Sequence, residues 1–289
     1  MTYAYYTLDV FTNTTFGGNP LAVFPDADGL SASQMQLLAK EFNLSECAFV
    51  LKSDDSQYDY KVRIFTPTME LPFAGHPTIG TAYLLNHLSQ SQTASLVFKE
   101  GVGKIALTFN GDWTGFYSAK MAQSTPTNIT NSQLSNLLQI DEKEICDEIN
   151  NQPLINSCGV DFLCIPLKSK ESVDNVNLSL AYHSDYLANT ANEHLYVFTE
   201  NDGDIHARMF APLMGISEDP ATGAAACALA GSLHKKYPNS ASALDFTITQ
   251  GEKMQRKSSL KLTFTREEEF SSIHLQGQCV ITSRGEFYI

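Results

Sequence analysis

The chain has 289 residues, a hydrophobic fraction of 43% and a formal net charge of −13. This length can bury one large core or two of ordinary domain size, and the negative charge argues against nucleic acid as a partner because phosphate backbones would be repelled. No apolar run approaches the roughly 18 residues that a membrane helix needs, and the N-terminus lacks the pattern of a signal peptide, so we expect a cytoplasmic protein without membrane contact.

The first part of the chain alternates between strand and helix signals. Residues 3–12 and 20–24 are rich in strand-forming side chains and flank the glycine-bearing turn TTFGGN, which predicts a strand pair. A helix is expected over 31–43, where Ser31 or Ser33 can cap an apolar face that repeats at helical spacing. Further strands are expected near 47–52, 58–65, 95–100 and 104–109, and a second helix over 77–88.

The second part of the chain repeats these signals after a polar stretch. Residues 118–153 are rich in Ser, Thr, Asn and Gln, which makes this stretch the best place for a domain boundary. An apolar stretch at 159–167 and strand signals at 194–200 and 206–210 follow. A second glycine-bearing helix start comes next.

Two segments of the sequence share one plan. FTPTMELPFAGHPTIGTA begins at Phe65, and FAPLMGISEDPATGAAA begins at Phe210. In both, a strand ends in Phe-x-Pro, and a short loop leads to a titratable residue, Pro, two further residues and Gly. His76 therefore matches Asp219, and this internal similarity suggests two related halves about a pseudo-twofold axis.

The helix that follows Asp219 is expected to be buried on every side. Its sequence, ATGAAACALAGSL, is almost entirely small and apolar and has no polar face. Such a helix fits a curled sheet or barrel wrapped around it. If both halves are built this way, two helix N-termini can open into one cleft, where unpaired N–H groups and the helix dipole favour a carboxylate or similar anion.

Three titratable residues are candidates for chemistry, and each has a structural alternative. Asp219 before Pro220 suits a helix N-cap, and Glu46 in NLSECAFV suits a solvated position at a strand entrance. Histidine is a poor N-cap, so His76 is harder to explain structurally. No metal site is predicted, because the chain lacks a His-x-x-x-His pair and an Asp-rich loop and its six cysteines lack CxxC or CxxH spacing.

Two motifs, GHPTIG and EDPATG, are highly specific in combination. With LDVFTNTTFGGNPLAVF, NLSECAFV and CGVDFL they resemble, in order and across nearly the whole chain, the phenazine biosynthesis PhzF-like isomerase family, which is similar in fold to diaminopimelate epimerase. The resemblance implies an α+β fold with two similar domains, each a curved, mostly antiparallel sheet or barrel around a central helix. The expected domains are 1–117, completed by a C-terminal strand at 276–289, and 118–275.

The resemblance also implies an activity and a set of roles. A homodimeric isomerase is expected, which moves a proton between carbons of a small anionic metabolite in the cleft between its domains, with no metal and no cofactor. The resemblance makes Glu46 the expected catalytic acid/base. This role suits a carboxylate in an apolar cleft, because desolvation raises its pKa toward neutrality. Its partners in catalysis are His76 and Asp219, and the expected substrate-binding residues are Ser45, Gly75, Gly223 and Ala224.

Departures from the family pattern leave the substrate open. Ala224 stands where the family's second motif continues with serine, and Gln255 and Lys257 stand where glycine and proline are usual. One alternative is a non-catalytic small-molecule-binding protein on the same fold. Another is an epimerase or racemase of an amino-acid-like substrate, which is disfavoured because the loops carry no cysteine pair and Cys47 and Cys227 only neighbour the motifs. A metal-dependent hydrolase that uses His76 is the third.

Overall fold

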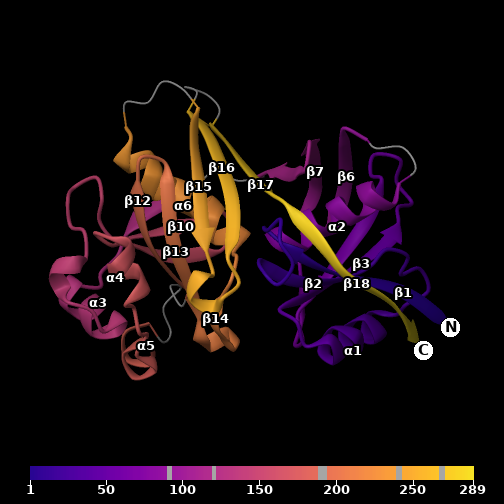
Figure 1. Ribbon diagram of the computed structural model, residues 1–289, viewed down its shortest axis with the longest axis horizontal. Coiled ribbons are helices and arrows are strands. Elements are labelled where there is room, and N and C mark those ends of the chain that lie inside the picture. Colours follow the sequence, from indigo (N-terminus) through magenta and orange to yellow (C-terminus); the bar gives the residue numbers. More distant parts are fainter. Residues whose placement is uncertain (90–92, 119–121, 188–193, 239–242, 267–270) are drawn as a thin grey trace. The chain divides into compact units, whose positions relative to one another are not determined.

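The computed structural model describes residues 1–89, 93–118, 122–187, 194–238, 243–266 and 271–289. The chain divides into two compact units, Met1–Ala119 with Gln276–Ile289 and Lys120–Leu275 (Figure 1). Residues 119–121, next to the expected domain boundary, lie outside the described residues. Each unit is a mixed sheet that packs around one central helix, which confirms the α+β fold class predicted from the sequence.

The first unit begins with the predicted strand pair. β1 (Thr2–Val10) pairs antiparallel with β2 (Asn19–Phe24), and β18 (Cys279–Tyr288) pairs antiparallel with the other edge of β1. The C-terminal strand is therefore part of the N-terminal sheet. The remaining strands of this unit are β3 (Glu46–Lys52), β4 (Tyr60–Phe65), β5 (Glu70–Leu71), β6 (Ser95–Glu100), β7 (Gly103–Asn110) and β8 (Trp113–Tyr117).

The second unit repeats the topology of the first. β2–β3 and β11–β12 are parallel, β3–β4 and β12–β13 are antiparallel, and β4–β6 and β13–β15 are parallel again. A short strand, β5 or β14, pairs antiparallel with β4 or β13 just before the central helix. The strands are β9 (Gln123–Pro126), β10 (Leu154–Ser157), β11 (Asp161–Pro166), β12 (Leu195–Asn201), β13 (Asp204–Ala211), β14 (Ile216–Asp219), β15 (Leu244–Gln250), β16 (Ser258–Arg266) and β17 (Ser271–Gly277), whose last two residues belong to the first unit.

A central helix lies against the sheet in each unit. α2 (Gly75–Leu88) packs on β1, β2, β3 and β8, and α6 (Gly223–Lys236) packs on β9, β10, β11 and β16. Most of α6 is buried, as its small apolar sequence predicts. Glycine is required where a strand approaches: a Cβ at Gly80 would lie 2.6 Å from Leu21 Cδ2, and one at Gly231 would lie 2.8 Å from Asn156 Oδ1. Within the described ranges no helix is long and apolar enough to cross a membrane.

The outer helices include α1 (Ala32–Phe42), which the sequence predicted, and α3 (Asn131–Leu138), α4 (Lys170–Asp174) and α5 (Leu180–Leu187), which it did not. α1 is capped by Ser31, whose side chain accepts from the Gln34 N–H in a capping box. α3 lies inside the polar stretch 118–153 and buries three leucines, a face too short to stand out among polar residues. The other short helices are η1 (Glu142–Glu144), η2 (Pro212–Met214) and η3 (Glu252–Met254).

Candidate active site

In the first unit, the fold brings Glu46 and His76 together. Glu46 is the first residue of β3, directly after the turn that ends α1, and His76 is the second residue of α2. The distance from Glu46 Oε2 to His76 Nε2 is 3.4 Å, and the exposed fractions of the two side chains are 14% and 7%. The alternative that Glu46 is a solvated strand-end residue is therefore wrong, because its carboxyl group is largely buried beside an imidazole.

The ring of His76 is held in one tautomer. Burial lowers the pKa of His76 to about 3, so the imidazole is neutral at ordinary pH, and the ring also hydrogen-bonds the backbone of Pro20. Because proline has no N–H, the imidazole must donate this bond to the Pro20 carbonyl. Nε2 has no hydrogen-bond partner among the described residues, so Nδ1 is the donor and Nε2 presents its lone pair to Glu46.

The other predicted residues of the first unit lie beside this pair. Ser45 precedes Glu46 and donates from Oγ to Asn19 Oδ1 at 3.0 Å, and Asn19 is the neighbour of Pro20 at the start of β2. Gly75 is the first residue of α2. Ser45 and Gly75 therefore lie one position before Glu46 and His76 along the chain.

A further acid, Glu100, lies under the first turn of α2 and was missed by the sequence analysis. Thr78 Oγ1 is 2.8 Å from both Glu100 Oε1 and the Ala74 carbonyl oxygen. Glu100 Oε2 is buried without a hydrogen-bond partner in the part of the chain that the structure describes, and burial raises the pKa of Glu100 to about 8. Thr78 has one hydroxyl proton for two oxygens, so a protonated Glu100 satisfies the contact best. The sequence signal was Thr78, one of two motif positions treated as variable.

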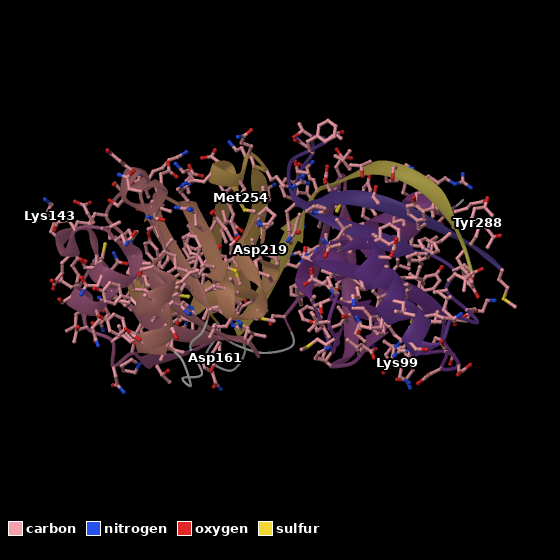
Figure 2. The ribbon with its side chains drawn as sticks, turned by 90° about the horizontal axis from the view of Figure 1, so that it is seen from below. Lys99, Lys143, Asp161, Asp219, Met254 and Tyr288 are labelled. Atoms are coloured by element: carbon pink, nitrogen blue, oxygen red, sulfur yellow. The ribbon has the colours of Figure 1, made fainter. Side chains whose placement is uncertain are left out.

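In the second unit, Asp219, labelled in Figure 2, is the last residue of β14 and is buried. It is not the N-cap of α6, contrary to the structural alternative from the sequence: the N-cap is Thr222, and α6 begins at Gly223. Pro220 likewise precedes the helix. Thr222 Oγ1 donates to Asp219 Oδ2, so the cap residue contacts the acid. Gly223 and Ala224 are the first two residues of α6, and the methyl group of Ala224 brings no hydroxyl to this helix start.

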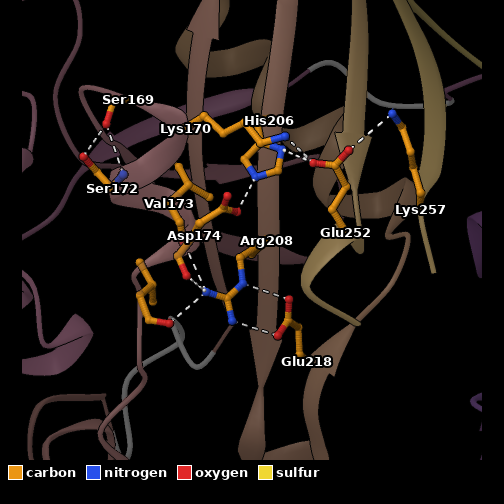
Figure 3. Close-up of polar contacts among 11 residues, drawn as sticks. Ser169, Lys170, Ser172, Val173, Asp174, His206, Arg208, Glu218, Glu252 and Lys257 are labelled. Atoms are coloured by element: carbon orange, nitrogen blue, oxygen red, sulfur yellow. Dashed lines mark hydrogen bonds and ion pairs between the residues drawn. The ribbon is translucent and has the colours of Figure 1, made fainter. Parts of the chain in front are cut away.

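An arginine clamp holds the strand that carries Asp219. Arg208 on β13 binds Glu218 through two hydrogen bonds of 2.9 Å, and its Nη1 donates to the carbonyl oxygens of Val173 and Val176 at 3.1 and 2.8 Å (Figure 3). Glu218 directly precedes Asp219 in β14. The bidentate geometry restricts β14 and with it the position of Asp219.

The cysteines near the motifs are unsuited to proton transfer. Cys47 and Cys227 are buried, and burial raises the pKa of Cys47 to about 12 and that of Cys227 further. Thiolates are therefore scarce at both positions. Over the described ranges no group of three or more His, Cys, Asp or Glu side chains is arranged to hold a metal ion.

The fold and the residues at the two helix starts define the class of the protein. Two units of one topology, each with polar residues at the start of a buried central helix, make the epimerase-like α+β fold expected from the motifs. A family model described as phenazine biosynthesis-like protein matches residues 8–285. The chain therefore belongs to the phenazine biosynthesis-like PhzC/PhzF family.

Relatives of the chain carry the name isomerase. The uncharacterized isomerase PM1503 of Pasteurella multocida is 35% identical over 99% of this chain and 94% of its own length. The trans-2,3-dihydro-3-hydroxyanthranilate isomerase of Pseudomonas fluorescens is 33% identical over 97% of this chain and 98% of its own. These names confirm the predicted enzyme class, an isomerase.

A solved structure supports the fold. The crystal structure of a Bacillus anthracis phenazine biosynthesis protein of the PhzF family has a TM-score of 0.91 to this chain, at 22% identity and with 100% of both chains covered. This likeness confirms the resemblance in fold that the motifs indicated.

Proposed function

We propose that the chain is a cofactor-independent isomerase that moves a proton between two carbons of a small anionic metabolite. The observation that carries this proposal is the contact between Glu46 and His76, 3.4 Å apart and largely buried. A buried carboxyl group beside a neutral imidazole can take a proton from one carbon and return it to another. Glu46 is the proton carrier, and His76, whose Nε2 lone pair lies beside that carboxyl group, is its partner in the proton transfer.

Asp219 is assigned to the same reaction on the strength of the family resemblance. Its role is to bind a polar group of the substrate, with Gly223 and Ala224 at the start of α6 and with Ser45 and Gly75 in the first unit as further substrate contacts. Family membership supports this assignment. We further propose that the enzyme is a homodimer, which light scattering on the purified protein tests.

The anionic substrate is proposed from the helix starts. In the described parts of the chain, neither Ala74 nor Thr222 makes a side-chain cap hydrogen bond to its helix. The first N–H groups of α2 and α6 are therefore not capped by these side chains, and such helix starts favour carboxylate or phosphate groups. The relative's substrate, trans-2,3-dihydro-3-hydroxyanthranilate, is the first compound to test. Ala224 in place of serine removes a hydroxyl contact and favours a different acid.

The test is solvent-deuterium exchange after a binding screen. Carboxylate metabolites that raise the melting temperature identify ligands, because binding to the folded state stabilises it. Each ligand is then incubated with the enzyme in D₂O, and mass spectrometry and NMR locate incorporated deuterium. We expect incorporation at a carbon. Binding without exchange for every ligand would favour the non-catalytic binding protein, and exchange that a chelator abolishes would favour a metal enzyme.

A further inference from the structure

Asp219 lies at the end of a chain of hydrogen bonds that begins at buried groups within the second unit. Tyr196 OH on β12 donates to Gln250 Oε1 at 3.2 Å, and Gln250 Nε2 donates to Thr222 Oγ1 at 3.1 Å. Thr222 Oγ1 in turn donates to Asp219 Oδ2. Tyr196 and Gln250 are fully buried, so these groups are shielded from exchange with bulk water.

Backbone groups determine which way the Gln250 amide points. Gln250 Nε2 lies 2.8 Å from the Asp219 carbonyl oxygen, which only accepts, and the Thr222 N–H, which only donates, lies 3.4 Å from Gln250 Oε1. The amide nitrogen must therefore face Asp219 and Thr222 Oγ1. Burial raises the pKa of Tyr196 well above its ordinary value, so the phenol keeps its proton and remains a donor to Oε1.

The orientation of the Gln250 amide determines the direction of the next hydrogen bond in the chain. Thr222 Oγ1 accepts a hydrogen bond from Gln250 Nε2–H, so its own O–H is directed to Asp219 Oδ2. A carboxylate that receives this hydrogen bond is stabilised in its charged, accepting form. Every bond in the chain thus has the same polarity, from Tyr196 to Asp219.

We propose that Tyr196, Gln250 and Thr222 are positioning residues that hold Asp219 as a hydrogen-bond acceptor, so that the substrate must present an N–H or O–H donor to it. This inference rests on the proposed function, because it assigns Asp219 to substrate binding and leaves proton transfer between carbons to Glu46.

Residues after Gln250 also hold the backbone between Asp219 and Thr222. Ser258 Oγ donates to the Pro220 carbonyl oxygen at 2.7 Å, and Ser258 is fully buried. A Cβ at Gly251 would lie 2.7 Å from that oxygen, so only glycine lets this segment approach. The segment from Gln250 to Ser258 therefore holds the backbone from Asp219 to Thr222 by contacts to two successive carbonyl groups.

The test measures the pKa of Asp219 by carboxyl carbon-13 NMR, with Asp219→Asn used to assign its signal. Thr222→Val removes the hydroxyl group at nearly constant shape, and Thr222→Ser retains it. We expect the Asp219 pKa to rise by about one pH unit in Thr222→Val and to stay at the wild-type value in Thr222→Ser. Melting curves of both variants control for folding.

An unchanged Asp219 pKa in a folded Thr222→Val variant would overturn the proposal. If that variant does not fold, Thr222→Ala supplies the answer: the Asp219 pKa should rise in it as well, and an unchanged value would contradict the chain. These results do not depend on turnover. If no ligand exchanges deuterium, the proposed isomerase activity is wrong. The titration of Asp219 still tests the hydrogen-bond chain by itself.

Discussion

Glu46 Oε2 lies 3.4 Å from His76 Nε2, although one residue begins a strand and the other belongs to the first turn of a helix. The contact depends on the parallel pairing of β2 with β3, in which Leu21 lies opposite Glu46. The residue before Leu21, Pro20, supplies the carbonyl that holds the imidazole. One strand register therefore sets both the position of the acid and the tautomer of the base.

The first prediction concerns Glu46 as proton carrier. Glu46→Gln keeps the size and polarity of the side chain but cannot take up a proton from carbon. We expect substrate binding to persist and deuterium incorporation to fall by roughly 100- to 10,000-fold. Glu41→Gln, the same substitution at an exposed position of α1, is the control and should exchange as the wild type. Undiminished exchange in Glu46→Gln would assign the proton transfer to another group.

The second prediction concerns acid stability and His76. Its pKa is about 3 when folded and about 6.5 when unfolded, so the unfolded state binds the extra proton between these values. Stability from the neutral buried ring is therefore full above pH 6.5 and is lost as the pH falls toward 3. Relative to His76→Asn, the wild type should lose about 2 kcal/mol of unfolding free energy by pH 5. Urea unfolding over this range measures it, with exposed His87→Asn as the control.

The third prediction has the opposite sign and concerns Glu100. Its folded pKa of about 8 lies above the unfolded value near 4.5, so the protonated form is the stable one in the core. Its contribution is full below pH 4.5 and is lost as the pH rises through 8. As the pH rises from 5 to 7.5, the free energy of unfolding of Glu100→Gln should therefore increase by about 3 kcal/mol relative to that of the wild type. Urea unfolding at several pH values checks the slope, with exposed Glu286→Gln as the charge control. If the difference in unfolding free energy between the variant and the wild type does not change with pH, burial does not raise the pKa of Glu100.

The fourth prediction compares the stability lost when Gln250 is replaced with the stability lost when its hydroxyl donor, Tyr196, is replaced. Gln250→Leu leaves the buried Asp219 carbonyl without the donor at 2.8 Å and should cost about 2–4 kcal/mol, because several polar groups lose partners at once. Tyr196→Phe removes one hydroxyl donor and should cost about 1 kcal/mol. Denaturant unfolding of the two variants gives the ranking. Equal losses would show that the Gln250 side chain is held mainly by packing.

The fifth prediction concerns Gln255, which stands where the family usually has glycine. Its φ of 57° lies in the left-handed region, where a Cβ is strained. Gln255→Gly should relieve about 1 kcal/mol of strain and lose part of that gain to the greater freedom of the unfolded chain. We expect a small net stabilisation, measured by melting temperature. Leu37→Gly, at an exposed position inside α1, is the control and should destabilise by about 1 kcal/mol.

Much of the fold could be predicted from the sequence by itself. The TTFGGN turn predicted the β1–β2 pair, Ser31 predicted the start of α1, and the small apolar run after EDPATG predicted a buried helix. These features depend on residues a few positions apart, whose periodicity and capping are local properties. The two matching motifs also indicated the repeated topology and the family, because their elements recur in the same order.

Only the tertiary structure decided what surrounds the motif residues. Thr78 contacts Glu100 from another strand, and Asp219 is joined through Thr222 and Gln250 to Tyr196. These partners lie far away in the sequence, and no local spacing marks them, because strand pairing and helix packing bring them together. Asp219 shows the physical reason clearly. Its sequence neighbourhood suits an N-cap, but the buried side chain of Gln250 and the pairing of β14 with β13 end the strand at Asp219 and start the helix at Gly223.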